Sequence, residues 1–144
     1  MRLQQAMAEL DLAALLHRYL PELFGRLAQL GASPAGAPYV RYHEFGPEQV
    51  DVEIGIPIRE PLGGVAVGDS GPGDVGASEL PGGEAALLVH VAPYEGLPQS
   101  YERLSGWIEG QGRTAGAGPW ESYVDDPSEV AMADVRTEIR WPLA

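Results

Sequence analysis

The sequence has 144 residues, of which 44% are hydrophobic, with 21 acidic residues, nine basic residues and no cysteine. This length and composition predict one folded domain with a buried core, and they exclude disulfides and thiolate chemistry. The net charge is −12 and lysine is absent. We therefore expect no nucleic acid partner, because such binding depends heavily on Lys and Arg contacts to phosphates, and the negative field favours cationic ligands.

Residues 1–20 contain polar and acidic side chains where a secretion signal requires an uninterrupted apolar run. No window of the sequence approaches the ~18 apolar residues that a membrane span requires. We therefore expect a cytoplasmic protein with no membrane partner.

The first predicted element is a long helix that begins after Asp11, an N-cap residue, and runs to about Leu30. Leucines recur along it at helical spacing, and Gly31 is a natural stop. Pro21 lies inside this pattern and is expected to kink the helix or divide it in two, because proline removes a backbone hydrogen bond. The preceding residues 2–9 are compatible with either a strand or a helical lead-in.

Two strands are predicted after a turn-rich link, over residues 39–45 and 50–58. The second alternates strictly, so that its aliphatic residues face the core while Asp51 and Glu53 face away. A linker rich in Gly and Pro follows at about residues 59–73.

The second half begins with a predicted strand pair, residues 74–81 and 84–94, joined by a Gly-Gly turn. Residues 85–91 are apolar on nearly both faces, which predicts a central buried strand. A helix is then expected to begin at Pro98 and to end at Gly110.

Two pairs of strands match each other in the same order along the chain. PYVRY at residues 38–42 lies over PWESY at 119–123, and residues 50–58 lie over residues 135–143. The offsets are 119 − 38 = 81 and 135 − 50 = 85, so a four-residue insertion in the second hairpin accounts for both. Similarity of this kind predicts a duplicated β-α-β-β unit.

The predicted fold class is therefore α+β. A single domain at 1–144 would contain two half-repeats, at about 1–60 and 74–144, that form one mostly antiparallel sheet with both helices on one face. The groove where the halves meet, on the pseudo-two-fold axis, is then the candidate ligand cleft.

The candidate site centres on PWESY. Glu121 and Tyr123 share one face of the predicted strand, and Trp120 shares the other with Ser122. A carboxylate beside an aromatic ring suits a bulky organic cation, although a solvated residue between packing aromatics is the alternative. Because the repeat places Val40 at the position of Glu121, the carboxylate is an addition to the scaffold.

With these residues assembled, the chain resembles the GyrI-like small-molecule-binding domain, which is also the effector-binding half of multidrug-sensing regulators of the MerR and AraC types. The resemblance rests on ELPGGEAALLVHVAPYEGLPQSYERLSGW, GPWESYVDDP and TEIRWPL, and it covers nearly the whole chain from about residue 11. Ala92 stands where the family often has glycine. No helix-turn-helix precedes the domain, so the role of a regulator is not carried over.

The resemblance implies an aromatic cleft that binds hydrophobic aromatic or cationic small molecules, with a buried glutamate at Glu121 and no cofactor or metal. The other residues expected at the ligand or at the rim of the cleft are Tyr42, His43, His90, Trp107, Trp120 and Tyr123. The alternative is a hydrolase that opens the strained cyclopropane ring of DNA-alkylating natural products. In that case Glu121 activates water and Tyr123 assists.

The residues themselves leave other roles open. Trp107 suits core packing as well as ligand stacking, the strand face of Trp120 favours the core, and His90 suits a hydrogen-bonded core position. Glu53 and Glu138 match across the repeat, which suits either a structural role or a paired site. The chain is expected to be a monomer or a homodimer, and regulation of another protein through its acidic surface is a third hypothesis.

Overall fold

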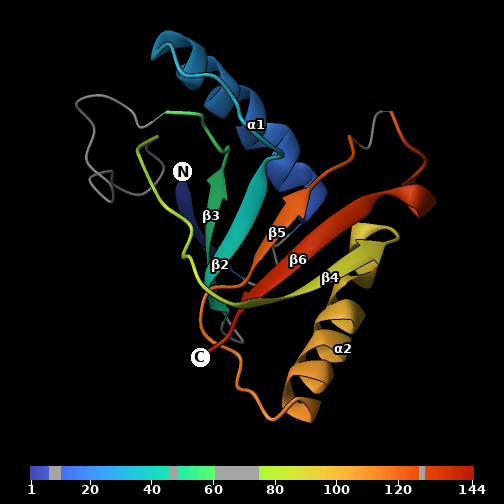
Figure 1. Cartoon of the computed structure of the whole chain (residues 1–144). Coiled ribbons are helices and arrows are strands. Elements are labelled where there is room, and N and C mark those ends of the chain that lie inside the picture. The colour runs from blue at the N-terminus through green and yellow to red at the C-terminus, as the bar shows by residue number, and fades with distance from the viewer. Residues whose placement is uncertain (7–10, 46–48, 61–74, 127–128) are drawn as a thin grey trace. The chain divides into compact units, whose positions relative to one another are not determined.

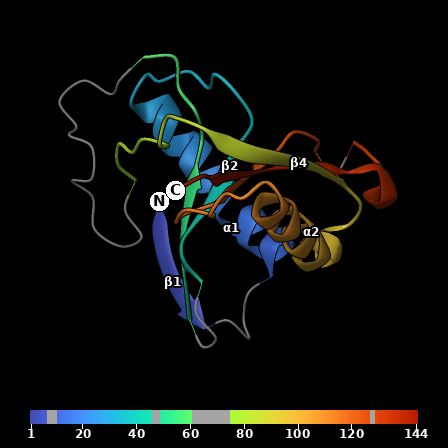
Figure 2. The same ribbon diagram turned by 60° about the horizontal axis from the view of Figure 1, so that its bottom comes forward.

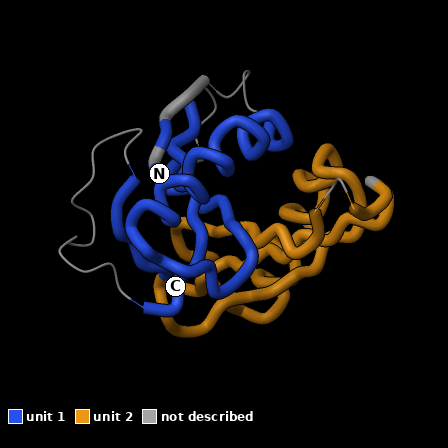
Figure 3. Tube along the Cα trace, turned by 90° about the horizontal axis from the view of Figure 1, so that it is seen from above, with its two compact units in different colours: residues 1–80 blue, residues 81–144 orange. Residues whose placement is uncertain are grey.

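The computed structural model describes residues 1–6, 11–45, 49–60, 75–126 and 129–144 (Figure 1). This part of the chain forms two compact units, Met1–Leu80 and Pro81–Ala144 (Figure 3). Each unit contains a strand, a helix and two further strands, so the predicted α+β class is confirmed. The predicted linker lies almost entirely outside the described residues.

The first unit consists of β1 (Arg2–Ala6), α1 (Leu12–Gln29), β2 (Tyr39–Phe45) and β3 (Gln49–Gly55). Strand β3 lies in the middle and pairs antiparallel with β1 on one side and β2 on the other (Figure 1). The presence of β1 decides the question that the sequence left open at the start of the chain.

Helix α1 has the ends that the sequence predicts. The side chain of Asp11 accepts a hydrogen bond from the backbone N–H of Ala14 at 3.1 Å, which caps the first turn. Gly31, just beyond the helix, has φ +69°, a conformation that glycine adopts without strain. The helix continues through Pro21 as one element, so of the two outcomes expected at this proline, a kink or a division, the division does not occur.

The core of the first unit contains leucines on one side of α1. Leu23 and Leu27 pack with Met1 and Ile56 in one buried cluster. Because these leucines are four residues apart, they lie on the same face of the helix. Neither helix in the described ranges combines the length and the apolar composition of a membrane span.

Strand β3 is buried on both faces, which its alternating pattern did not predict. Asp51 and Glu53, expected to face away from the core, are each only 6% exposed. On the same face the ring of Tyr39 lies over Gly55, so closely that a Cβ atom there would collide with it. The carboxylates are therefore covered by protein and must be satisfied by hydrogen bonds.

The second unit consists of β4 (Ala85–Val91), the short 3₁₀ helix η2 (Tyr94–Gly96), α2 (Leu97–Gly110), β5 (Trp120–Tyr123), the 3₁₀ helix η3 (Met132–Asp134) and β6 (Arg136–Pro142). Strand β6 lies in the middle and pairs antiparallel with β4 and with β5. Helix α2 packs against one face of β4 (Figure 2).

Both units therefore have the same strand order, with the last strand of each unit in the centre. The registers also agree, because Val40 lies opposite Ile54 in the first unit and Glu121 lies opposite Ile139 in the second. These pairs have the predicted offsets, since 121 − 40 = 81 and 139 − 54 = 85. The β-α-β-β repeat read from the sequence is confirmed, and so is the equivalence of Val40 and Glu121.

Two predictions for the second half are wrong. The described residues 75–81 form no strand, and their Gly and Pro content explains why. Strand β4 is not central: within the second unit β6 lies between β4 and β5, and the residues of β4 alternate between exposed and buried or partly buried. A run that is apolar on both faces thus lies at an edge, with one apolar face uncovered.

Candidate functional site

Glu121 lies on β5 with only 1% of its surface exposed. A carboxylate in such a position requires hydrogen bonds, because burial removes its hydration. Two tyrosines supply them. The hydroxyl of Tyr123 donates to Oε1 at 2.7 Å, and the hydroxyl of Tyr101 donates to Oε2 at 2.7 Å. Each carboxylate oxygen therefore accepts a short hydrogen bond from a neutral group.

Three elements of the second unit hold this arrangement in place. Tyr123 follows Glu121 by two residues on β5, so both side chains are on one face of the sheet. Tyr101 reaches the carboxylate from α2, and its ring packs edge to face against Trp141 of β6, with centroids 5.7 Å apart. The indole N–H of Trp141 in turn donates to the carbonyl of Gly116 at 2.8 Å.

A third tyrosine completes the cluster. Tyr94 in η2 packs edge to face against Tyr123, with ring centroids 5.6 Å apart. It is 8% exposed, and its hydroxyl has no hydrogen-bond partner among the described residues. Burial raises the pKa of Tyr94, and the negative charge of Glu121 raises it further. The hydroxyl therefore stays protonated at neutral pH, and a buried donor without an acceptor is uncommon in a native structure.

His90 is occupied by the fold. Its Nδ1 lies 2.7 Å from the hydroxyl of Ser100, and its Nε2 lies 2.9 Å from the carbonyl of Pro93. Because a carbonyl only accepts, Nε2 carries the proton in the neutral ring and Nδ1 accepts from the serine. The ring also packs close to Gly96, where an added Cβ would lie 3.0 Å from it. The interpretation of His90 as a hydrogen-bonded core residue thus fits these contacts.

The remaining predicted residues lie in different surroundings. Trp120 is buried at 7% exposure, as a packing residue would be. Trp107 is 56% exposed on α2, so its alternative assignment to the core is wrong. Tyr42 and His43 belong to the first unit, where Tyr42 is buried at the position equivalent to Tyr123.

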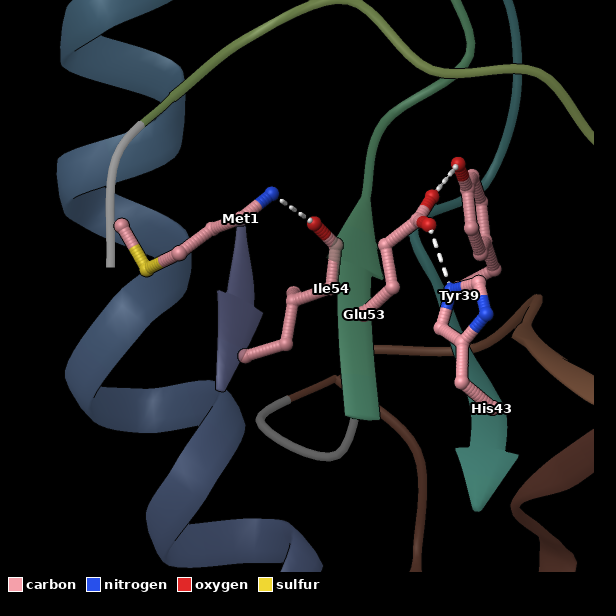
Figure 4. A network of polar contacts seen from close by, with 5 residues as sticks. All are labelled: Met1, Tyr39, His43, Glu53 and Ile54. Atoms are coloured by element: carbon pink, nitrogen blue, oxygen red, sulfur yellow. Dashed lines mark hydrogen bonds and ion pairs between the residues drawn. The ribbon is translucent and has the colours of Figure 1, made fainter. Parts of the chain in front are cut away.

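The first unit contains a second buried carboxylate, that of Glu53 on β3 (Figure 4). The hydroxyl of Tyr39 donates to its Oε2 at 3.0 Å, and Nε2 of His43 donates to its Oε1 at 2.8 Å. On the neighbouring strand the amino group of Met1 donates to the carbonyl of Ile54 at 2.9 Å. His43 thus engages a carboxylate of its own unit.

The hydrogen bonds of Glu53 keep it ionised. Burial is the largest single influence and opposes ionisation, but the hydrogen bonds from His43, Ser78 and Tyr39 together outweigh it and place the pKa of Glu53 below its ordinary value. Burial also raises the pKa of Tyr39, as does the negative charge of Glu53, so the tyrosine remains the donor. Glu138, the counterpart of Glu53 in the repeat, is instead partly exposed and pairs with Arg140 at 2.8 Å.

We expect the Glu53→Gln variant to be destabilised at neutral pH and to approach the wild type in acid. The folded pKa of Glu53 lies below the ordinary value of 4.5. Its charge therefore stabilises the fold above that value, and the contribution disappears as the pH falls through the folded pKa. Urea unfolding of both proteins at about pH 7 and about pH 3 measures the difference. Glu138→Gln is the control, and a Glu53→Gln deficit that does not shrink in acid would contradict the expectation.

The sequence pattern of the GyrI-like small molecule binding domain matches residues 14–144. The chain belongs to this family. The C-terminal domain of EcmrR is similar in structure, with a TM-score of 0.77 and 21% identity, and the match covers 99% of this chain and 89% of that one. EcmrR in a complex with DNA matches with a TM-score of 0.72 and 21% identity. No curated protein matches the chain.

These likenesses show that the GyrI-like domain has the fold of the EcmrR C-terminal domain, and they correct one prediction. From the negative net charge we expected no nucleic acid partner, whereas this fold occurs in an EcmrR–DNA complex. The match covers 99% of this chain and 52% of that EcmrR chain. The exclusion was wrong because the charge of one domain does not limit what a chain about twice as long binds.

Sequence reasoning missed Tyr94, Tyr101 and Trp141 as neighbours of the buried glutamate. The signals were present but not specific. Tyr101 precedes Leu104 by three residues, which predicts that both lie on one face of the helix. Trp141 follows Ile139 by two residues, which places both on the same face of the strand. Such spacing assigns residues of the GyrI-like domain to the inner face of each element, but it does not say which ring meets the carboxylate.

Among the described residues no group of three His, Asp or Glu side chains is arranged to hold a metal ion. The cluster of Glu121, Tyr94, Tyr101 and Tyr123 provides one carboxylate and three phenols. Such a cluster combines a buried carboxylate, aromatic surfaces and one buried hydroxyl that has no acceptor among the described residues. Its members all belong to the second unit.

Proposed function

We propose that this GyrI-like domain binds bulky hydrophobic small molecules that are aromatic or cationic, with Glu121 as the counter-charge. One observation carries the proposal: a carboxylate that is 1% exposed is hydrogen-bonded by two tyrosine hydroxyls. Hydrogen bonds from neutral groups stabilise a carboxylate without cancelling its charge. We expect a lipophilic cation to bind beside this carboxylate, at a depth where water screens charges weakly.

The aromatic neighbours support the same class of ligand. The rings of Tyr94, Tyr101, Tyr123 and Trp141 lie in edge-to-face pairs around the carboxylate. Aromatic rings attract cations and offer flat apolar surfaces, so a lipophilic cation gains from both contributions. A buried charge is otherwise unfavourable for stability, and its presence on a largely buried strand between two aromatic residues fits a role in binding.

The proposal predicts that Glu121→Gln weakens binding of tetraphenylphosphonium, a lipophilic aromatic cation, about tenfold to a hundredfold. A hydrogen-bonded or ionic contact to a charged group contributes about 1.5–3 kcal/mol, which corresponds to that factor. Triphenylphosphine oxide is a neutral aromatic probe of similar shape, and its affinity is expected to change little. Tryptophan fluorescence and isothermal titration measure both affinities.

Glu138→Gln is the matched control, because it removes the same charge from a partly exposed site on the opposite face of β6. This variant tests whether the overall negative field accounts for the effect. Equal losses of affinity in the two variants, or an unchanged affinity in Glu121→Gln, would refute the role of Glu121. If tetraphenylphosphonium does not bind the wild type at all, the proposed ligand class is wrong.

The other predicted ligand contacts have unequal support. The exposed indole of Trp107 is free to stack on a ligand, whereas both ring nitrogens of His90 are engaged within the fold. Contacts from Tyr42, His43 and Trp120, the cleft on the pseudo-two-fold axis and the cytoplasmic location all stay predictions.

A hydrolase is the second candidate function, and it is favoured by the hydroxyl of Tyr94, which has no hydrogen-bond partner in the part of the chain that the structure describes. Glu121 would take a proton from water while the water oxygen bonds to a carbon of a strained cyclopropane and a ring bond breaks. The hydroxyl of Tyr94 would donate a hydrogen bond to the group that receives the electrons of the broken bond.

Chromatography of a cyclopropane-bearing alkylator incubated with the protein distinguishes hydrolysis from binding. A hydrolase produces the ring-opened alcohol in excess of the protein, and Tyr94→Phe slows its formation. A binding protein lowers the free alkylator by at most one equivalent and yields no product above background.

A further inference from the structure

Strand β4 exposes a row of three apolar side chains on the sheet face that is not covered by α2. Leu87, Val89 and Val91 are 54%, 48% and 56% exposed, respectively. The intervening His90 points to the other face, where it contacts Ser100 of α2. Single exposed aliphatic residues are ordinary, but three in succession on one face of one strand form a continuous stripe.

The backbone of the same three residues is also not paired on its outer side by any other described strand. The carbonyl of Glu84 accepts a hydrogen bond from the N–H of Leu143, and the N–H of Ala92 donates to the carbonyl of Val135. Both partners directly flank β6. Backbone groups alternate in direction along a strand, so the even-numbered residues point to β6 and the odd-numbered residues point away. Among the described strands β4 pairs with β6 alone, and Leu87, Val89 and Val91 therefore direct their N–H and C=O groups outwards.

Edges of this kind are normally protected, and β4 lacks the usual protection. Its sequence, AALLVHV, contains no Lys, Arg, Asp, Glu or Pro. Its pairing with β6 is regular over seven residues and has no bulge. Pro93, which has no backbone N–H, lies two residues beyond Val91 and limits any further ladder to the strand itself.

We propose that β4 pairs antiparallel with β4 of a second copy of this chain, about a two-fold axis at Val89. In this register Val89 of one copy lies opposite Val89 of the other. Leu87 of each copy lies opposite Val91 of its partner. All three residues direct their backbone groups to the partner, which provides about six hydrogen bonds. The two apolar stripes then form one continuous surface that each copy supplies equally, as a two-fold interface requires.

The charge distribution makes β4 a more favourable contact for a second copy than the rest of the surface. The chain has a net charge of −12, so two copies repel one another at most approaches. On β6 the neighbours of the stripe are already paired, Arg136 with Asp125 and Arg140 with Glu138. In the proposed register Glu84 lies five residues from the axis, which keeps the Glu84 side chains of the two copies far apart. Strand β4 is therefore a neutral place at which two acidic chains can meet.

Disulfide formation tests the register directly, because the chain has no cysteine of its own. Val89→Cys is expected to form a covalent dimer under mild oxidation, since residues opposite each other across a hydrogen-bonded pair have Cα atoms about 5.5 Å apart. Leu87→Cys is expected not to, because its symmetry mate lies about 13 Å away, four residues along the strand. The double variant Leu87→Cys with Val91→Cys restores the cross-link.

Sedimentation equilibrium provides the second measurement, free of cross-linking. One strand per copy is a small interface, so we expect the wild-type dimer to have a dissociation constant of about 1–100 µM. Val89→Arg should weaken association at least tenfold while leaving the pairing of β4 with β6 and the circular dichroism spectrum unchanged. Phe24→Arg, at another exposed apolar residue on α1, is the control that retains the dimer.

Three results would overturn the proposal. The first is a wild type that stays monomeric at millimolar concentration, in which case the edge serves a different partner or none. The second is a dimer that Val89→Arg leaves intact, which would place the interface elsewhere. The third is efficient cross-linking of Leu87→Cys without that of Val89→Cys, which would exclude this register.

Discussion

The Val40→Glu variant is expected to lose about 3–5 kcal/mol of unfolding free energy, because it places a charge at a site that is fully buried and apolar. Val40 is the counterpart of Glu121 in the repeat. Its neighbour Tyr42 matches Tyr123, but nothing matches Tyr101. The buried residues of α1 are all leucines, so this helix has no fully buried hydroxyl to offer the second oxygen.

Urea unfolding measures this loss, and Val40→Gln separates the effect of charge from that of size and polarity. We expect the glutamine variant to be destabilised by a smaller amount, about 1–3 kcal/mol, since a neutral amide is easier to bury. A Val40→Glu protein within about 1 kcal/mol of the wild type would show that this strand position accepts a carboxylate without a tyrosine from the helix. The special status of Glu121 would then be lost.

The Gly55→Ala variant is expected to be destabilised by about 3 kcal/mol, through one added methyl group. A Cβ at residue 55 would collide with the ring of Tyr39, which lies opposite it on β2. Overpacking of a buried site costs about 1–3 kcal/mol, and displacement of the ring also breaks the hydrogen bond from Tyr39 to Glu53. In the second unit the equivalent pair is Trp120 and Arg140, which shows that the close approach belongs to the first unit.

Gly25→Ala is the matched control for this substitution. Gly25 lies within α1 and an added Cβ there meets no atom within 4 Å. Alanine at this position is expected to stabilise the protein by about 0.5–1 kcal/mol, because glycine is a poor helix former. Thermal or urea unfolding of the two variants should therefore give changes of opposite sign. Changes of the same sign and size would mean that the ring of Tyr39 moves aside at little cost.

Much of the fold could be predicted from the sequence because the two halves repeat. The offsets of 81 and 85 residues identify equivalent positions without any coordinates, and the registers opposite Ile54 and Ile139 agree with them. Helix ends were similarly accessible, since Asp11 and Gly31 act through local backbone geometry. Features that depend on neighbours along the chain were thus predictable.

Features that depend on neighbours in space were not. Strand β4 has the composition of a central strand, and no local pattern states how many strands flank it. Asp51 and Glu53 alternate as exposed residues do, but the ring of Tyr39 and the side chain of Ser78 reach the face of Glu53. The sequence singles out Glu121 by its difference from Val40, and the role of Glu121 stays a prediction. Its hydrogen-bond partner Tyr101 comes from another element.

For the proposed ligand site, the contacts of His90 have a consequence for the kinetics of binding. The ring joins β4 to Pro93 and to Ser100, and Tyr94 lies within the segment that these two hydrogen bonds enclose. The phenol is therefore oriented when the domain folds, before any ligand arrives. A ligand that meets an ordered ring loses little conformational entropy on the protein side, and its association needs no slow rearrangement. Selectivity then rests on the shape of the ligand, since a rigid site cannot adjust to one that fits poorly.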